Sequence, residues 1–147
     1  MSKRSKKIVE SEESEKGTES LYEQIKNASK GLYYVSETDA EIKPFVGTMA
    51  NEVSKSEILR QINKPLETPV EERNFDEIFE RLTKIQDWYG EEETETAAKF
   101  SVLRDLLKKN LTGLKVFKVG KIELDIYFVG LDAQGILTGI KSQAVET

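Results

Sequence analysis

The residues of this chain that could do chemistry are carboxylates, lysines, tyrosines and hydroxyl side chains, because the 147-residue sequence contains neither histidine nor cysteine. Their absence excludes Ser-His-Asp and Cys-His nucleophiles, histidine general bases, zinc fingers, haem ligation and structural disulfides. The sequence also lacks a glycine-rich phosphate-binding motif, since its nine glycines are scattered at expected turns. No residue pattern supports catalysis, and we do not expect an enzyme.

The densest group of carboxylates is formed by Glu91, Glu92, Glu93 and Glu95. Clustered carboxylates can act as a general acid and base pair or as ligands of a metal ion. At the start of a helix, however, they are usually solvated groups that stabilise the positive end of the helix dipole. No Asp-x-Asp-x-Asp-Gly calcium loop is present. We therefore favour the structural role.

The segment just before this acidic run, Gln86-Asp87-Trp88-Tyr89, contains the only tryptophan of the chain. A tryptophan among polar and acidic residues suggests an interface anchor, because tryptophan is enriched at the hot spots of protein interfaces. The alternative is a core role, in which the indole packs inward while the loop stays in water. The sequence leaves both roles open.

The last segment, residues 136–147, is a predicted strand that continues to the end of the sequence. Most chains fray at their ends. A sheet that held Val145, Glu146 and Thr147 in place would present the terminal carboxylate as a fixed anionic ligand. We therefore expect this end of the chain to have a binding function.

The overall charge favours a basic partner. The formal net charge is −5 and the isoelectric point is about 5.0, which disfavours a surface for nucleic-acid phosphates. No stretch approaches the roughly 18 apolar residues of a membrane span, and the charged start lacks the apolar segment of a signal peptide. We expect a soluble, cytoplasmic protein with no membrane contact.

One domain is expected to position these residues, because the chain is too short for two comfortable domains. We place it at residues 18–147 and expect residues 1–17, which are mostly Lys, Ser and Glu, to be a disordered tail. The basic run at residues 3–7 resembles a nuclear localisation or nucleic-acid patch. The acids that follow offset its charge, so a plain tail is favoured.

Apolar residues at helical spacing predict four helices. Three begin with a capping-box pattern, in which Ser20, Ser54 and Asn74 are each followed three residues later by glutamate. In the fourth, acids precede an apolar stripe and lysines follow it, matching the helix dipole. The first three helices are expected near residues 19–30, 55–63 and 75–84. The apolar stripe of the fourth runs from Phe100 to Leu111, and Gly113 is a plausible stop.

Strands are expected mainly in the last third of the chain. Residues 115–119, 121–129 and 136–147 have strand character, and their short connections require antiparallel pairing. Two further strands are expected, one at residues 32–35 and an irregular or edge strand at 42–49, where Pro44 and Gly47 disfavour a central position. Helices followed by an antiparallel meander predict an α+β fold.

Several of these segments resemble the nuclease A inhibitor family, small acidic bacterial proteins that inhibit a sugar-nonspecific, metal-dependent endonuclease. The resemblance is strongest over residues 86–147, where it includes Gln86-Asp87-Trp88-Tyr89, Glu123-Leu124-Asp125 and the terminal Val145-Glu146-Thr147. A second block at residues 28–37 resembles the start of the family, whereas residues 38–85 match it poorly.

The resemblance implies an α/β/α sandwich with an antiparallel sheet, a variant of the PR-1-like fold. It implies that Glu37, Gln86, Trp88 and Thr147 contact a DNA/RNA nonspecific endonuclease of the ββα-metal type. By the same resemblance, Thr147 is a ligand of the nuclease's magnesium or manganese, only in the complex, and the protein has no cofactor of its own. We expect a monomer that forms a 1:1 complex and does not bind nucleic acid directly.

A second interpretation is an acidic interaction module with the same fold and a different basic protein as its partner. The divergent region at residues 38–85 favours this alternative.

Overall fold

The computed structural model describes residues 20–147, so the tail expected at residues 1–17 lies outside the described residues. The helices are α1 (Leu21–Ser29), α2 (Lys55–Gln61), α3 (Phe75–Thr83) and α4 (Glu91–Asn110). The strands are β1 (Tyr33–Val35), β2 (Asp39–Glu41), β3 (Lys43–Met49), β4 (Val70–Arg73), β5 (Thr112–Gly120), β6 (Glu123–Leu131) and β7 (Ile136–Val145). Of the helices within residues 20–147, none combines the length and the apolar character needed to cross a membrane.

The helix starts follow from local sequence. The side chains of Ser20, Ser54 and Asn74 each accept a hydrogen bond from the backbone N–H of the glutamate three residues on, at 3.1, 3.2 and 2.9 Å. These bonds satisfy N–H groups that have no partner within the helix. α4 begins differently, because the backbone N–H of Gly90 donates to the Glu93 carboxylate at 3.0 Å. The predicted helix starts at Ser20, Ser54 and Asn74 are confirmed.

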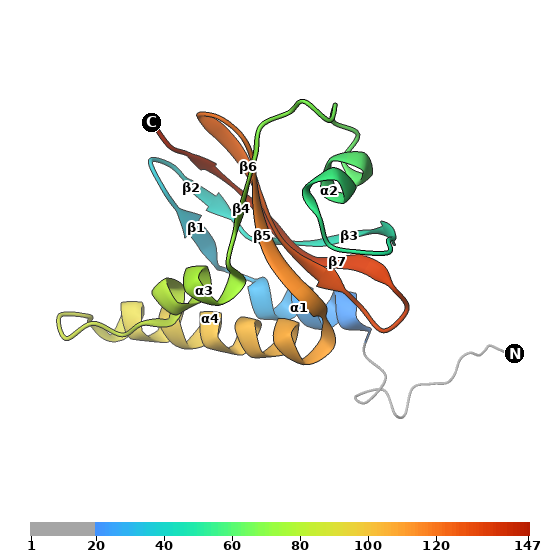
Figure 1. The fold of residues 1–147 in the computed structure, drawn as a ribbon. Helices are drawn as coiled ribbons and strands as arrows, with labels where there is room; N and C mark the ends of the chain where they lie inside the picture. Colours follow the sequence, from blue (N-terminus) through green and yellow to red (C-terminus); the bar gives the residue numbers. More distant parts are fainter. Residues whose placement is uncertain (1–19) are drawn as a thin grey trace, which may run out of the picture.

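Five strands form one antiparallel sheet in the order β3-β7-β6-β5-β4, and β1 and β2 form a separate antiparallel hairpin (Figure 1). The last strand of the chain, β7, is an interior strand with β3 on one side and β6 on the other. β3 is an edge strand with a register shift between Val46 and Met49, in agreement with the prediction from Pro44 and Gly47. The α+β fold is confirmed.

Some strand boundaries differ from the prediction. β4 was not expected, because its sequence Val-Glu-Glu-Arg has a single apolar residue, and it lies at the sheet edge beside β5. β5 begins at Thr112 rather than at residue 115, and Gly113, with φ +67°, lies in the irregular stretch that opens it. β7 ends at Val145, so Glu146 and Thr147 follow the strand.

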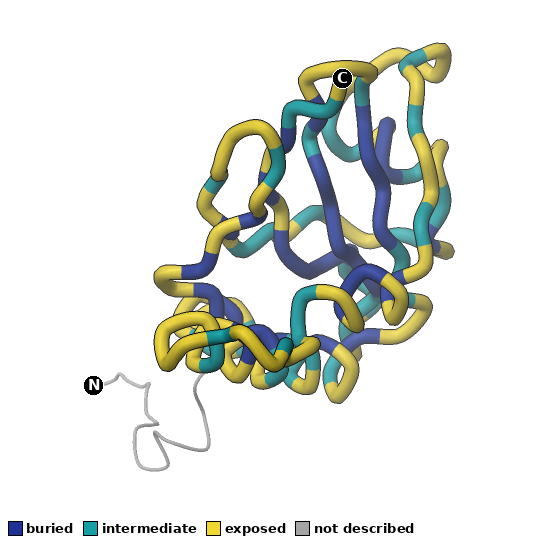
Figure 2. Tube along the Cα trace, turned by 90° about the vertical axis from the view of Figure 1, so that its left-hand side faces the viewer, coloured by how far each residue is buried: buried dark blue, intermediate teal, exposed yellow. Residues whose placement is uncertain are grey.

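Helices cover both faces of the five-stranded sheet. On one face α1, α3 and α4 pack over a core that includes Phe79, Leu103 and Phe128 (Figure 1). On the other face α2 contributes to a second core, which includes Ile58 and Tyr127. Along β6, Leu124, Ile126 and Phe128 belong to the first core, and Tyr127 and Val129 belong to the second. The buried stretches follow the strands, and the connecting loops are mostly exposed (Figure 2).

Candidate protein-binding surface

The end of the chain is fastened to the tip of the β1–β2 hairpin. The backbone N–H of Val145 donates to the Ser36 hydroxyl at 3.0 Å, and the backbone N–H of Glu37 donates to the carbonyl of Val145 at 3.3 Å. The β2 strand of the hairpin is also bonded to β7, because the Ser142 hydroxyl donates to the carbonyl oxygens of Ala40 and Glu41, each at 3.0 Å. The C-terminus and the hairpin tip consequently lie side by side (Figure 1).

Two of the predicted site residues meet at this junction. The Thr147 hydroxyl donates to Oε2 of Glu37 at 2.5 Å, and the Thr147 backbone N–H donates to the same oxygen at 3.3 Å. Both residues are exposed. Because the hydroxyl proton is directed at Glu37, the lone pairs of the Thr147 oxygen remain available to a group outside the molecule.

A buried lysine holds the residue before Thr147. Lys118 of β5 is only 6% exposed, and its Nζ donates to the Glu146 carboxylate at 3.0 Å. On the backbone, the N–H of Glu146 donates to the carbonyl of Ile122 at 2.9 Å. Sequence reasoning missed Lys118, although a lysine between Phe117 and Val119 in a predicted strand was a signal of a buried charge that needs a partner.

Trp88 lies on the surface. Its side chain is 74% exposed in the loop between α3 and α4, which excludes the core role that the sequence left open. The loop turns there, because the backbone N–H of Tyr89 donates to the carbonyl of Gln86 at 3.1 Å. The indole meets the ring of Tyr89 edge to face, with 4.7 Å between ring centroids. Gln86 is half-buried at the start of the turn.

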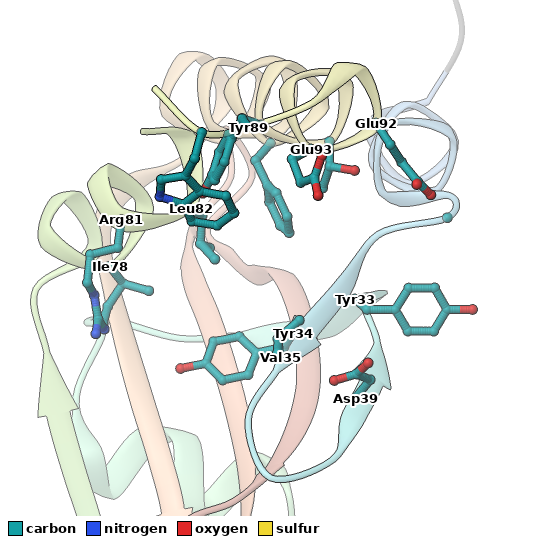
Figure 3. A pocket seen from close by; sticks show the side chains of 15 residues that line it. Tyr33, Tyr34, Val35, Asp39, Ile78, Arg81, Leu82, Tyr89, Glu92 and Glu93 are labelled. Carbon is teal, nitrogen blue, oxygen red and sulfur yellow. The ribbon is translucent and has the colours of Figure 1, made fainter. Parts of the chain in front are cut away.

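A cavity of about 850 Å³ lies between the β1–β2 hairpin and the α3–α4 loop (Figure 3). Its lining combines buried apolar side chains with exposed aromatic and aliphatic side chains of the two walls. Residues of the lining include Tyr33, Tyr34, Val35, Ile78, Trp88 and Phe100. The structure therefore places Trp88 opposite strand β1, whose hairpin tip carries Glu37.

The four predicted site residues thus form two groups, and the β1–β2 hairpin borders both. Its tip carries Glu37, and its strand β1 lines the cavity that Trp88 also lines. Glu37 and Thr147 are hydrogen-bonded at the hairpin tip, and Gln86 and Trp88 lie in the α3–α4 loop. Within residues 20–147, no hydrogen bond or ion pair joins the two groups. Both are on the same side of the molecule, which is the left side in Figure 1.

The acidic run at the start of α4 has a structural role in part. Glu91, Glu92 and Glu93 lie in the first turn of the helix, where negative charge is stabilised by the helix dipole. Glu93 also accepts the hydrogen bond from Gly90. Over residues 20–147, no group of three or more acidic side chains is arranged to hold a metal ion.

Comparison with protein families gives a match that spans most of the chain. Residues 19–147 match a family model described as nuclease A inhibitor-like protein. The match includes the hairpin, the Trp88 loop and the terminal residues. It also includes residues 38–85, where the sequence resembles the family least. No curated protein gave a significant match. This chain therefore belongs to the nuclease A inhibitor-like protein family.

Proposed function

We propose that this protein inhibits a nonspecific DNA/RNA endonuclease of the ββα-metal type by occupying its active-site cleft. Membership of a nuclease-inhibitor-like family supports the inhibitor role and favours a protein that is not itself an enzyme. The proposed mode of binding is based on the hydrogen bond between Thr147 and Glu37, which holds two exposed oxygen-bearing side chains side by side. The proposed complex is 1:1, forms in the cytoplasm and involves a monomeric inhibitor.

Charge complementarity supports this mode of binding. A cleft that holds nucleic-acid phosphates must be electropositive, and the net charge of −5 draws the inhibitor toward it. At closer range, the carboxylates of Glu37 and Asp87, both exposed, face the arginine or lysine side chains that otherwise contact phosphates. The inhibitor thus substitutes carboxylates for phosphates.

The donor set at the hairpin tip fits the magnesium or manganese of a bound nuclease. These ions prefer hard oxygen ligands, and Thr147 supplies an oxygen that is exposed at the end of the chain. Glu37 accepts a hydrogen bond from the Thr147 hydroxyl, so the lone pairs of that hydroxyl oxygen are left for the ion. Hydrogen bonds of this kind orient metal ligands in general. Within this chain, the role of Glu37 is to position Thr147 and to add negative charge beside it.

Trp88 and Gln86 supply the second point of attachment. An indole that is 74% exposed becomes largely desolvated when a partner covers it, which is the behaviour of a hot-spot residue. The turn between Gln86 and Tyr89 holds the indole on a short, hydrogen-bonded segment. Two separated attachment points on one side of the molecule would fix the orientation of the inhibitor in the cleft.

The direct test is a titration of a ββα-metal endonuclease with this protein, read as cleavage of a plasmid. We expect nuclease activity to fall to zero at one equivalent of inhibitor. Full activity at a large excess of inhibitor would contradict the proposal and favour the alternative of an acidic module for another basic protein.

A tagged variant tests the role of Thr147. Several neutral residues added after Thr147 should weaken inhibition at least about tenfold, because the terminal oxygens can no longer reach the metal. The melting temperature should stay nearly unchanged, since Thr147 is exposed. The matched control carries the same residues before Met1. Equal inhibition by the two tagged proteins would contradict the role of Thr147.

A further inference from the structure

We infer that the cavity between β1 and the start of α4 is a pocket for one arginine or lysine side chain of the bound nuclease. This inference rests on the proposed function, because the pocket would be an additional contact of the same protein-binding surface. The cavity volume of about 850 Å³ admits a side chain together with part of the loop that carries it. The occupant is identified by three properties of the lining, which are an apolar floor, aromatic walls and an acidic rim.

The floor of the cavity suits the aliphatic stem of a long cationic side chain. Tyr34, Ile78 and Phe100 line it and are 7%, 2% and 3% exposed. Arginine and lysine bury their methylene groups along such apolar surface while the charged head stays at the rim. A short acidic side chain would gain nothing from this floor.

The walls add aromatic groups that attract a cation. Tyr33 and Trp88 line the cavity and are 50% and 74% exposed, so their rings are accessible from outside. A guanidinium or ammonium group near the face of a tyrosine or tryptophan is attracted by the ring quadrupole. The two residues come from opposite walls, since Tyr33 is in β1 and Trp88 is in the α3–α4 loop.

The rim is predominantly acidic. The lining holds three carboxylates, Asp39, Glu92 and Glu93, against one guanidinium, that of Arg81. In Figure 3, Glu92 and Glu93 extend from the start of α4 toward the cavity and Asp39 lies on the β2 side beneath them, whereas Arg81 is at the opposite end.

Two of these carboxylates are available for a partner. Within the described part of the chain, neither Asp39 nor Glu92 forms an ion pair or a side-chain hydrogen bond. Glu93 already accepts the hydrogen bond from Gly90. Asp39 and Glu92 are therefore two unpaired negative charges of the lining, which favours a cationic occupant over an anionic or purely apolar one.

A matched pair of double variants tests the pocket in the complex. D39N combined with E92Q removes two of the three carboxylates of the rim. E52Q combined with E67Q removes the same amount of charge from exposed sites outside the lining of the cavity. Binding to a ββα-metal endonuclease is measured by calorimetry, and folding by melting temperature. We expect the rim variant to bind about tenfold more weakly and the control less than about twofold more weakly. Equal losses would overturn the pocket, because only long-range charge would then act.

The isolated protein offers an independent readout, since Trp88 is the only tryptophan and lines the cavity. Its fluorescence is followed during titration with acetyl-Gly-Arg-Gly amide and with the neutral analogue in which citrulline replaces arginine. We expect a saturable change with the arginine peptide alone, lost in the D39N/E92Q variant. Identical responses to both peptides would overturn the pocket. An arginine-specific response in a protein that fails to inhibit the nuclease would instead overturn the proposed function and leave the pocket intact.

Discussion

At the scale of single residues, the candidate site is defined by side chains whose orientation is set before any partner arrives. The hydroxyl of Thr147 points at Glu37, and the carboxylate of Glu146 is held by Lys118. Groups that are already ordered lose less conformational entropy on binding, so more of their interaction energy contributes to affinity. Glu146 and Thr147 are therefore better suited to binding than residues without such contacts.

Replacing Trp88 by alanine should weaken binding of the nuclease by about 2 kcal/mol, or roughly thirtyfold, because an exposed indole that becomes buried is a typical hot spot. The melting temperature should change little, since the side chain is 74% exposed. The measurements are a nuclease titration and a thermal melt.

The matched control for this variant is Leu66→Ala, which truncates an apolar side chain that is 73% exposed on the α2 side of the molecule. We expect Leu66→Ala to leave inhibition unchanged. A large drop in melting temperature for Trp88→Ala, or equal effects of the two variants on inhibition, would argue against an anchor at Trp88.

Replacing Lys118 by methionine should affect inhibition more than stability. Methionine has a similar length and suits the buried site, while Glu146, whose side chain is 41% exposed, can turn toward water once its partner is gone. Thr147 then loses the support of its neighbour, and we expect inhibition to weaken about fivefold to tenfold. The unfolding free energy, measured by urea denaturation, should change by about 1 kcal/mol or less.

Lys115→Met provides the comparison for Lys118, because Lys115 is also in β5 and pairs with Glu72 at 3.5 Å in a partly exposed setting. Along the strands, Lys115 is opposite Val129, which is opposite Gly139 of β7, whereas Lys118 reaches Glu146. The Lys115 pair therefore lies away from the end of β7, and its loss should leave inhibition unchanged. If both lysine variants inhibited like the unmodified protein, Lys118 would have no positioning role.

At the scale of elements, two side chains of helix α2 bond the backbone of the edge strand β3. Arg60 donates to the carbonyl of Met49 at 3.4 Å, and Gln61 makes the closer contact. The Gln61 amide bonds the backbone of Thr48 twice, accepting from its N–H at 2.8 Å and donating to its carbonyl at 3.0 Å. This pairing imitates a neighbouring strand and satisfies polar groups that an edge strand leaves open. It requires a glycine beside it, because a Cβ at Gly47 would lie 1.9 Å from the Gln61 side-chain oxygen.

A double-mutant cycle tests this arrangement. Gln61→Ala removes these two hydrogen bonds and a third, to the Glu57 carboxylate at 2.8 Å, and should lower the unfolding free energy by about 1 to 2 kcal/mol. Gly47→Ala should have a similar effect, because the new methyl group displaces the Gln61 amide. Combined, the two changes should cost little more than Gln61→Ala alone, since the clash disappears with the amide. The measurement is urea denaturation of all four proteins.

A second pair of substitutions, at Gly47 and Gln143, serves as the reference for this cycle. Gln143 is an exposed residue of β7 outside the Gln61 contact. Gly47→Ala and Gln143→Ala should add within about 0.5 kcal/mol. Additive effects of Gly47→Ala and Gln61→Ala would show that the glycine is required for another reason.

The elements that the sequence predicted well are those specified locally. The helix starts at Ser20, Ser54 and Asn74 were predictable, because a cap and its glutamate are only three residues apart. β4 escaped prediction because its stability comes from pairing with β5, which is remote in sequence, rather than from an apolar pattern. For the same reason, the polar residues of β6 gave no indication that α2 covers the second face of the sheet.

The sequence suggested the single residues of the candidate site, but not the contacts between them. Resemblance to the family identified Glu37 and Thr147 separately, but they are 110 positions apart, and the bond between them depends on how β7 packs against the hairpin. The exposure of Trp88 likewise depends on the turn of its loop, and the cavity on two elements that are distant in sequence. Long-range packing of this kind leaves no local signal.

At the scale of the whole molecule, the net charge of −5 should govern the rate of association with a basic nuclease. Raising the salt concentration from about 10 mM to about 150 mM should lower the association rate constant roughly tenfold, because screening shortens the range of attraction. The dissociation rate constant should change much less, since it depends on contacts formed at short range. Stopped-flow fluorescence of Trp88 measures both. A salt-independent association rate would exclude electrostatic steering.

The interior position of β7 has a consequence for how the protein is made. β7 is translated after every other strand, yet it separates β3 from β6, so the edge strand β3 has no sheet partner until residues 136–145 leave the ribosome. Pairing between segments so distant in sequence is slow to form. A nascent chain that already displays the Trp88 loop therefore lacks the junction between the hairpin tip and Thr147. Under the proposed function, a nascent chain would therefore not inhibit the nuclease until its sheet is complete.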